Sequence, residues 1–473
     1  MLDLRDTNNL DLTDTLVSKK VASMYRDLEA NLMGGITNRQ YVMLAVNLVY
    51  HSPLAYYFQG EMVEKGPAEL LIIGDTRVGK SAVTKKFHEF FQGRGEFIQG
   101  EAVTLAGLLA GVDESVGSRF VRIGRLPMFH RRIVTIDEAN ELSTEITSQL
   151  SGVRSSGLFD LIKISTKRIP CLVRIIWVAN SKTDKQVTEY NYGVEAVRDF
   201  FERPEDIARL DLAICLTQQD VNRESLYITQ EKRSKVPHKF TSEWCCKVLD
   251  WGWSRKPEQW LLPAETEQEV LRWCKVLSRK YDDGIPLIVE SESRIQISRM
   301  ACSLACSLFS HDGSYENVLV KPEHVEYIGN FIQLCFDAPS MAYGEWSKVQ
   351  KSGGVEDEGR VKGVCRALGK DGINVILENK ITKEEFSRIF NDRGDGELCY
   401  SIMMLARMIK RGRYGVELTP PARKYLKRAS KSVDYQGSPD SLSLRVAAGK
   451  MEESELFDQS SGSEEIVDKE LGW

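Results

Sequence analysis

Residues 70–81 read LLIIGDTRVGKS, an apolar stretch that runs directly into the motif Gly74-x-x-x-x-Gly79-Lys80-Ser81. The glycines allow the backbone to curl so that successive N–H groups point at a polyphosphate, and a helix that starts at the lysine adds the positive end of its dipole. In such a loop the lysine reaches the β- and γ-phosphates, and the serine hydroxyl ligates Mg²⁺. The motif lies between a strand-like run and a helical run, so we interpret it as a nucleotide-binding loop. A turn of similar composition without a ligand is the alternative.

The composition is that of an ordinary globular protein. Apolar residues make up 42% of the 473 residues and charged residues 28%, enough for two or three domains with substantial cores. No apolar run is long enough to cross a membrane and the N-terminus is polar, so we expect neither a signal peptide nor a membrane span, and a cytoplasmic location. The ten cysteines include no CxxC pair, which favours buried free thiols over a zinc site.

The net charge of −5 is unevenly distributed along the chain. Residues 431–473 carry ten acidic and four basic side chains and few apolar ones, which predicts an acidic, disordered tail that could bind a partner. The rest of the chain is nearly neutral. Net charge therefore neither indicates nor excludes a nucleic-acid ligand. The evidence for or against such a ligand must come from local clusters of basic side chains.

The first half of the chain has the pattern of an α/β domain. After a polar segment at 1–13, which we predict to be disordered, residues 14–57 have helical periodicity and 60–67 resemble a loop. Buried-looking strands then alternate with helices, which predicts a parallel sheet covered on both faces over 14–240. The clearest strands are expected at 70–73, 133–136, 172–178 and 210–215, and a helix is expected at 80–91.

The second half is mainly helical. Residues 241–336 are expected to form a helical subdomain, with helices at 265–280, 291–309 and 321–335, and 337–354 is expected to be a linker. Over 355–430, three helical runs (359–368, 382–390 and 398–411) are followed by a turn, a strand and a last helix. This order is the outline of a winged helix.

Two adjacent carboxylates, Asp137 and Glu138, end the apolar run IVTI. At the end of such a strand, Asp137 would hold Mg²⁺ through water and Glu138 would orient and deprotonate an attacking water. A strand that simply ends in solvated acids is the alternative. The predicted nucleotide and metal ligands are therefore Gly74, Asp75, Thr76, Arg77, Val78, Gly79, Lys80, Ser81 and Asp137, for ATP and Mg²⁺.

Two further polar residues flank later strands. Asn180 ends the run LVRIIWVAN and could hold the same water, and Arg209, in DIARLDLAICL, could reach a γ-phosphate bound by a neighbouring subunit. Strands often end in asparagine, and a surface arginine is common. From the residues alone, both roles stay open.

The order of these motifs resembles that of AAA+ ATPases. The amino-acid sequence between the motifs resembles that of the minichromosome maintenance (MCM) helicases. The stretches that carry the resemblance are QGEAVTLAGLLAGVDES, GRLPMFHRRIVTIDEANEL and RSSGLFDLIKISTKRIPCLVRIIWVANS, followed by Arg209-Leu210-Asp211-Leu212. The resemblance covers about residues 15–335 and implies an AAA+ P-loop core with a helical lid. A C-terminal winged helix is also consistent with this family. It also implies a ring-forming DNA translocase or helicase of DNA replication.

The resemblance assigns roles by position. It implies that Lys80, Glu138, Asn180 and Arg209 act in ATP hydrolysis, with Arg209 as an arginine finger. A sensor 2 arginine should begin the helix at 291–309, with Arg294 as first choice and Arg299 as second. A helix-2 insert at 113–125 and a pre-sensor hairpin at 158–170 would grip single-stranded or forked DNA in the pore of a hexamer. The predicted DNA contacts there are Arg119, Arg122, Lys163, Lys167 and Arg168.

The sequence departs from the family pattern in several places. Thr76-Arg77 stands where the family usually has Pro-Gly, and the hairpin-tip lysine falls on Ile162, with Lys163 beside it. The residues before the ATPase module are too few for the N-terminal domain that binds DNA and forms hexamers in the MCM family. We therefore expect a minimal version of the family from a prokaryote, virus or plasmid, or a ring that forms through the ATPase module and a partner. Arg411 and Arg413, in a basic cluster of the predicted winged helix, are candidate duplex contacts, although the same fold also docks proteins.

Two other functions remain open from the sequence. Chaperone-like AAA+ remodelling ATPases that act on proteins share the helix-2 insert and the pre-sensor hairpin. An origin-binding initiator or loader would hydrolyse ATP without processive unwinding. The acidic tail could recruit a replication partner in any of these cases.

Overall fold

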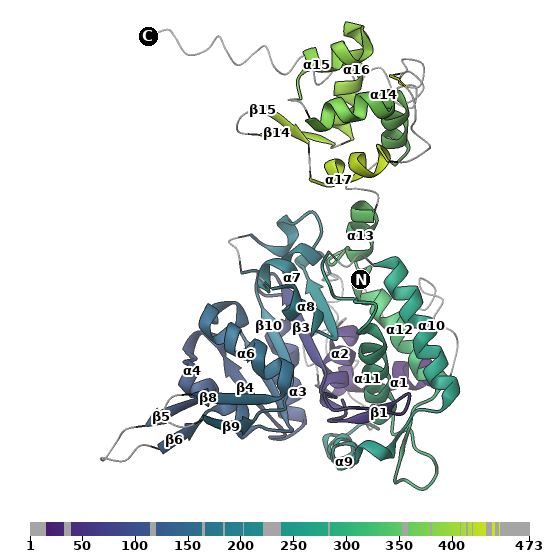
Figure 1. Cartoon of the computed structure of the whole chain (residues 1–473). Helices are drawn as coiled ribbons and strands as arrows, with labels where there is room; N and C mark the ends of the chain where they lie inside the picture. The colour runs from purple at the N-terminus through teal and green to yellow at the C-terminus, as the bar shows by residue number, and fades with distance from the viewer. Residues whose placement is uncertain are drawn as a thin grey trace. The chain divides into compact units, whose positions relative to one another are not determined.

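The computed structural model divides the chain into two compact units, Met1–Trp346 and Ser347–Trp473, each with its own hydrophobic core (Figure 1). The described residues are 16–32, 39–113, 120–162, 166–182, 185–201, 203–220, 238–281, 284–351, 358–378, 381–406, 408–412, 415–418, 420–431, 438–439 and 444. The predicted disordered segment 1–13 lies outside them.

The first unit is built on a five-stranded parallel sheet. Its order is β11 (Leu212–Leu216), β3 (Glu69–Gly74), β10 (Arg174–Ala179), β7 (Ile133–Asp137) and β4 (Gly95–Gln99). Every residue of β3, β7, β10 and β11 is buried, as expected for strands covered on both faces. The predicted α/β class is confirmed. The edge strand β4, GEFIQ, was missed because it is short and only partly apolar.

Helices pack around this sheet. They include α3 (Lys80–Phe90), α6 (Thr144–Ser156), α7 (Val194–Phe200) and α8 (Pro204–Ala208), and at the N-terminal side α1 (Leu16–Leu32) and α2 (Gln40–Tyr50). All of α2 is buried, and it contacts β3, β10 and α3.

A short hairpin follows α2, where the sequence predicted the end of a helical segment and a loop. It consists of β1 (Tyr56–Phe58) and β2 (Glu61–Val63). Its two turn residues, Gln59 and Gly60, both have positive φ, 51° and 79°. That geometry is typical of the tight two-residue turn that joins antiparallel strands. The turn formed by these two residues therefore produces a hairpin where the helical periodicity predicted the end of a helix.

Two more hairpins arise between the sheet strands. The short helix α4 (Leu105–Leu108) leads into β5 (Ala110–Asp113) and β6 (Phe120–Ile123), and β8 (Leu158–Ile162) pairs with β9 (Thr166–Pro170). The second occupies the predicted range 158–170. The first begins three residues before the predicted insert, because Ala110 pairs with Ile123. It projects away from the sheet in Figure 1.

Arg125 was predicted to belong to the insert, and that was wrong. It begins α5 (Arg125–Met128), and its Nη1 lies 3.0 Å from Glu96 Oε1 on β4. Arg125 is therefore tied to the edge of the central sheet.

The lid region contains four main helices, α9 (Ser242–Trp253), α10 (Ala264–Lys280), α11 (Ser293–Ser307) and α12 (Pro322–Phe336). The last three pack against one another. A two-residue parallel pair, β12 (Trp260–Leu261) and β13 (Val318–Leu319), also occurs in this mainly helical region.

The predicted linker at 337–354 was wrong in part, because it contains the helix α13 (Tyr343–Lys351). Tyr343 stacks on Tyr281 with ring centroids 4.8 Å apart, and its hydroxyl donates to the Ile285 carbonyl at 2.7 Å. Trp346 is also buried. These aromatic contacts attach the start of the segment to the lid.

The second unit contains α14 (Glu358–Glu378, kinked at Gly369), α15 (Lys383–Phe390) and α16 (Arg393–Leu405). An antiparallel pair, β14 (Ile409–Gly412) and β15 (Gly415–Leu418), and then α17 (Pro420–Ala429) follow. The predicted helix at 398–411 was wrong at its end, because α16 ends at Leu405 and residues 409–412 form the strand β14, which pairs with the expected strand. The winged-helix assignment stays a prediction. Leu444 is fully buried in the core of this unit, so the predicted disordered tail at 431–473 was wrong at that residue.

Candidate ATP site and its partner surface

The glycine-rich loop lies where β3 ends and α3 begins. Gly79, the residue before α3, has φ of +90°, which a side chain would strain. Arg77 also has a left-handed backbone, with φ of +63°, although it carries a side chain. Arg77 occupies one of the two positions that the sequence singled out as unusual. Its conformation puts local strain in the loop.

Lys80 is buried at the start of α3. Its Nζ donates to the carbonyl oxygens of Gly74 (2.8 Å) and Asp75 (2.6 Å) and to Oδ1 of Asn180 (2.9 Å). Burial lowers the pKa of Lys80 to about 8, and the nearby carboxylates of Asp75 and Asp137 partly oppose this shift. The ammonium is held inside the loop, where the phosphates of a nucleotide would lie.

Ser81 and Asp137 bring two oxygen ligands together. The Ser81 hydroxyl donates to Asp137 Oδ1 at 2.8 Å, and the Nζ of Lys85 lies 3.9 Å from Asp137 Oδ2. A hydroxyl and a carboxylate beside a phosphate site fit Mg²⁺, which takes few protein ligands and completes its shell with phosphate and water. Among the described residues, no group of three or more His, Cys, Asp or Glu could hold a metal by itself.

Glu138 follows β7 in a left-handed conformation, with φ of 54°. Burial raises the pKa of its carboxyl, and the neighbouring acids Glu101 and Asp137 raise it further. The backbone is held tightly here, since a Cβ on Gly100 would lie 2.3 Å from the Glu138 carbonyl oxygen. A more basic carboxylate next to the candidate magnesium ligands suits the abstraction of a proton from water.

Asn180 follows β10, the strand between β3 and β7. Its backbone N–H donates to Asn140 Oδ1 at 3.0 Å, and its side chain accepts from Lys80. Because parallel strands end at the same edge, the sheet order places Asn180 between the loop and the carboxylates. All the predicted loop residues from Thr76 to Ser81, with Asp137, Glu138 and Asn180, line one cavity of about 300 Å³.

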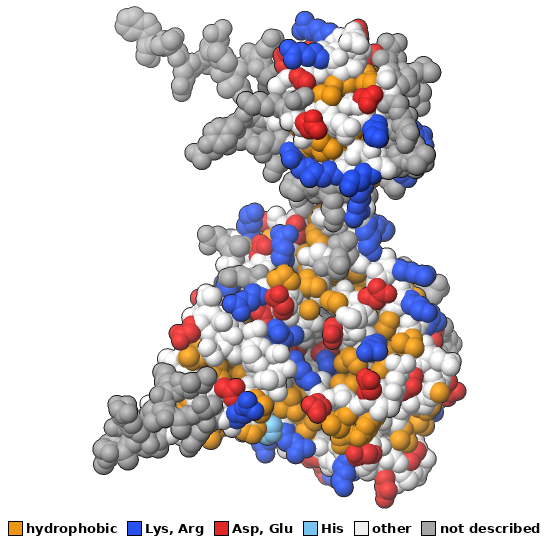
Figure 2. All heavy atoms as spheres, in the orientation of Figure 1, with side chains coloured by type: hydrophobic (Ala, Val, Ile, Leu, Met, Phe, Trp, Pro, Cys, Tyr) orange, Lys and Arg blue, Asp and Glu red, His pale blue; other side chains and the backbone are white. Residues whose placement is uncertain are grey.

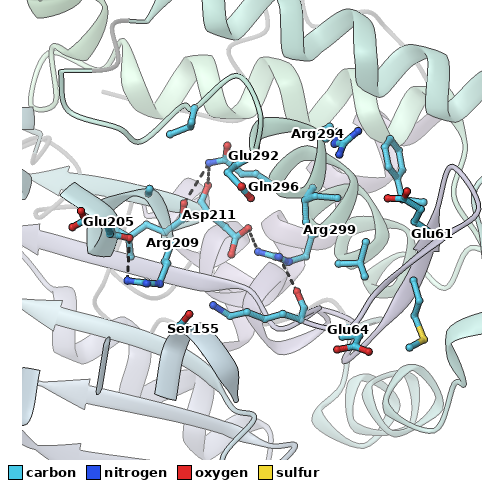
Figure 3. A pocket seen from close by; sticks show the side chains of 18 of the residues that line it. Glu61, Glu64, Ser155, Glu205, Arg209, Asp211, Glu292, Arg294, Gln296 and Arg299 are labelled. Atoms are coloured by element: carbon cyan, nitrogen blue, oxygen red, sulfur yellow. Dashed lines mark hydrogen bonds and ion pairs between the residues drawn. The ribbon is translucent and has the colours of Figure 1, made fainter. Parts of the chain in front are cut away.

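Arg209 and Arg294 line a different cavity, of about 940 Å³ (Figure 3). Arg209 follows α8 and Arg294 lies in the first turn of α11, and in Figure 3 they lie on opposite sides of the pocket. The two cavities have no lining residue in common. The described residues therefore do not bring Arg209 into the loop cavity of its own chain.

Arg299, the second choice for sensor 2, has a structural partner. Its Nη1 lies 2.6 Å from Asp211 Oδ1; Asp211 is buried and Arg299 is partly buried. Its Nη2 donates to the Lys65 carbonyl at 2.8 Å. These contacts occupy both terminal nitrogens of Arg299, so the geometry favours Arg294 for any role toward a ligand.

The predicted DNA contacts are only partly described. Arg122 on β6 is exposed, and Arg168 on β9 is exposed and lies 3.3 Å from Asp160 on the paired strand. Arg119 and Lys163 lie outside the described residues, and for Lys167 only the backbone is described. Acidic and basic side chains intermingle on the face of the first unit visible in Figure 2. That view offers no broad basic surface among the coloured atoms.

The structure describes little of the candidate DNA contacts in the predicted winged helix. Arg411 lies on β14 with only its backbone described, and Arg413 lies outside the described residues. On α17, Arg423, Lys427 and Arg428 are exposed.

Sequence reasoning missed two residues at or near these cavities. Arg39, just before α2, donates to the Val78 carbonyl at 3.0 Å and so braces the loop from outside. Lys65 lines the larger cavity with Arg209 and Arg294, and burial lowers its pKa. Neither belongs to a motif. Their roles depend on long-range packing, which the sequence pattern does not reveal.

One comparison with known proteins found a match. The family model described as the MCM P-loop domain matches residues 13–224, which include the loop, both acids, Asn180 and Arg209. A search of curated proteins found no match. No helix in the described part of the chain is long and apolar enough to cross a membrane.

Proposed function

Residues 13–224 form an MCM P-loop domain, an ATPase domain of the AAA+ type, and from this premise we propose that the chain is a ring-forming DNA translocase or helicase of DNA replication. ATP would be hydrolysed at the interfaces between subunits, with Mg²⁺ as cofactor. A hexamer with single-stranded or forked DNA in its pore is the expected assembly, and the C-terminal unit would act as a winged helix.

The observation that carries the proposal is the separation of the two cavities. The loop cavity holds Lys80, Asp137, Glu138 and Asn180, whereas Arg209 lines the other cavity. If Arg209 acts on a γ-phosphate, it would therefore act on one that is bound by a second copy of the chain. A head-to-tail contact between copies generates a closed ring or a helical filament.

Each residue would have a distinct task in hydrolysis. Lys80 and the loop N–H groups would hold the β- and γ-phosphates, and Ser81 and Asp137 would hold Mg²⁺, which neutralises developing negative charge. Glu138 would take a proton from the attacking water, which Asn180 helps to hold. Arg209 and Arg294 of the adjacent copy would stabilise the charge on the transferred phosphoryl group, and Lys65 lies in the same cavity.

The β5–β6 and β8–β9 hairpins would carry the DNA contacts through Arg122, Lys167 and Arg168, together with Arg119 and Lys163. The ion pair between Arg168 and Asp160 is exposed, so its contribution is small and a phosphate can replace it. A hold on backbone phosphates is independent of sequence and weakens as salt rises.

The test is strand displacement on forked DNA, combined with oligonucleotide binding at two salt concentrations. A translocase should unwind the fork with ATP, and its binding should weaken steeply with salt. ATP hydrolysis without DNA binding would indicate a remodelling ATPase that acts on proteins. Binding without processive unwinding would indicate an initiator or loader.

A further inference from the structure

We propose that Asp206 is a positioning residue for Arg209, held in place by the buried guanidinium of Arg154. The proposal rests on the role of Arg209 as the finger that completes a neighbouring ATP site. It adds the residues that set the position of its guanidinium.

Arg209 is held through one nitrogen. Its Nη1 donates to Asp206 Oδ1 (2.9 Å), to Ser151 Oγ (3.1 Å) and to the carbonyl of Glu205 (3.2 Å). These contacts, all within the described part of the chain, leave Nε and Nη2 for another acceptor. One edge of the guanidinium is thus fixed, while the other edge can bind phosphate oxygens.

Asp206 is itself anchored from behind. The same Oδ1 atom accepts from Arg154 Nη1 at 3.0 Å, and Arg154 Nη2 donates to the Asp206 carbonyl at 2.8 Å. Arg154 is buried, and its Nε lies 2.6 Å from Glu69 Oε2 at the start of β3. Its guanidinium also lies 4.8 Å from the centroid of the Phe201 ring. The carboxylate therefore sits between one immobile arginine and one arginine at the edge of the cavity.

This arrangement reduces the freedom of the finger. A free arginine side chain loses rotamer entropy when it is fixed, so fixing it before the nucleotide arrives favours catalysis. The anchors Ser151 and Arg154 both lie on α6, whose C-cap Gly157 leads directly into β8. The finger is thus anchored to the helix that continues into the β8–β9 hairpin.

The fold should tolerate the loss of Asp206. In an Asp206→Ala variant, Arg154 would keep the Glu69 carboxylate and the carbonyl of residue 206, so its buried charge stays paired. The melting temperature reports any structural damage. Glu64→Gln is the control, because it removes the same charge on another side chain that lines the cavity.

The experiment is a double-mutant cycle on steady-state ATPase activity, with ATP affinity measured separately. We expect Asp206→Ala to lower kcat by about tenfold or more while the Kd for ATP changes less than about threefold. Asp206→Asn, which keeps an acceptor oxygen, should lose less activity, and Glu64→Gln should stay close to wild type. In an Arg209→Ala background, Asp206→Ala should have no further effect.

The possible outcomes separate the positioning role of Asp206 from the finger role of Arg209. If Arg209→Ala lowers kcat but Asp206→Ala does not, or if the two effects multiply, the positioning role is contradicted and the finger stands. If Arg209→Ala leaves kcat unchanged, the finger assignment itself fails. An effect of Glu64→Gln as large as that of Asp206→Ala would show that the charge of the cavity matters rather than the position of Arg209, and would also overturn the proposal.

Discussion

Lys80 Nζ donates to Asn180 Oδ1 at 2.9 Å and so joins the phosphate-binding loop to the end of a neighbouring strand. The two residues are 100 positions apart in sequence. They meet because β3 and β10 are adjacent parallel strands that end at the same edge of the sheet. The contact places a neutral amide oxygen beside the lysine that would bind the γ-phosphate.

Replacing Asn180 should impair hydrolysis more than binding. Asn180→Ala removes an acceptor for Lys80 and the side chain proposed to hold the attacking water. We expect kcat to fall by about tenfold or more with less than about threefold change in the Kd for ATP. Asn330→Ala is the control, because the one hydrogen bond of its Nδ2 among the described residues lies within α12, to the Glu326 carbonyl. Equal activity of both variants would contradict the role of Asn180.

Gly100 should be required for the position of Glu138. A Cβ at residue 100 would lie 2.3 Å from the Glu138 carbonyl oxygen, so Gly100→Ala must displace this peptide. We expect a loss of ATPase activity of about tenfold or more, with ATP still bound. Gly152→Ala on α6 is the matched control, since nothing lies within 4 Å of its added Cβ. Wild-type activity of Gly100→Ala would show that the backbone of Glu138 is not held in this way.

The binding of ATP should depend on pH through Lys80. Burial lowers the pKa of this lysine to about 8 in the nucleotide-free loop, and bound phosphates favour the charged form and raise it again. Binding therefore takes up a proton above about pH 8, and affinity should fall by up to about tenfold per pH unit there, while it stays level below about pH 7.

Calorimetry in two buffers of different ionisation enthalpy measures this proton uptake. Lys80→Arg serves as the comparison, because a guanidinium stays charged throughout this range. An affinity of the wild-type protein that does not change between about pH 7 and 9 would contradict the lowered pKa.

Arg77 offers a test of strain in the loop. Its backbone has φ of +63°, where glycine is favoured over any residue with a Cβ. Arg77→Gly and Arg77→Ala both remove the side chain, but only the first removes the Cβ. We expect the free energy of unfolding to be higher for Arg77→Gly by about 1 kcal/mol. Equal stabilities in denaturant titration would mean that the loop relaxes around the substituted residue.

The sequence predicted the parts of the site that are local in the chain. The loop at Gly74–Ser81 and the acids Asp137 and Glu138 follow short apolar runs that can only be buried strands, so their positions at one sheet edge could be inferred. The β1–β2 hairpin was missed because its strands have three residues each, too few for a periodic signal.

The contacts around Arg209 could not be predicted in the same way. Arg154 pairs with Glu69 and Asp206, at separations of 85 and 52 residues, through ion pairs that no local pattern encodes. For the same reason, the sequence could not choose between Arg294 and Arg299. The choice depends on Asp211, which is 88 residues from Arg299 in the sequence and accepts a hydrogen bond from its guanidinium.

The central claim is that each ATP site is shared between two copies of the chain. The most direct measurement mixes Lys80→Ala with Arg209→Ala, two variants that should each be inactive alone. An interface that joins the intact loop of one variant to the intact Arg209 of the other is complete, so an equal mixture should regain about a quarter of the wild-type ATPase activity. A mixture that co-assembles and remains inactive would contradict the shared site.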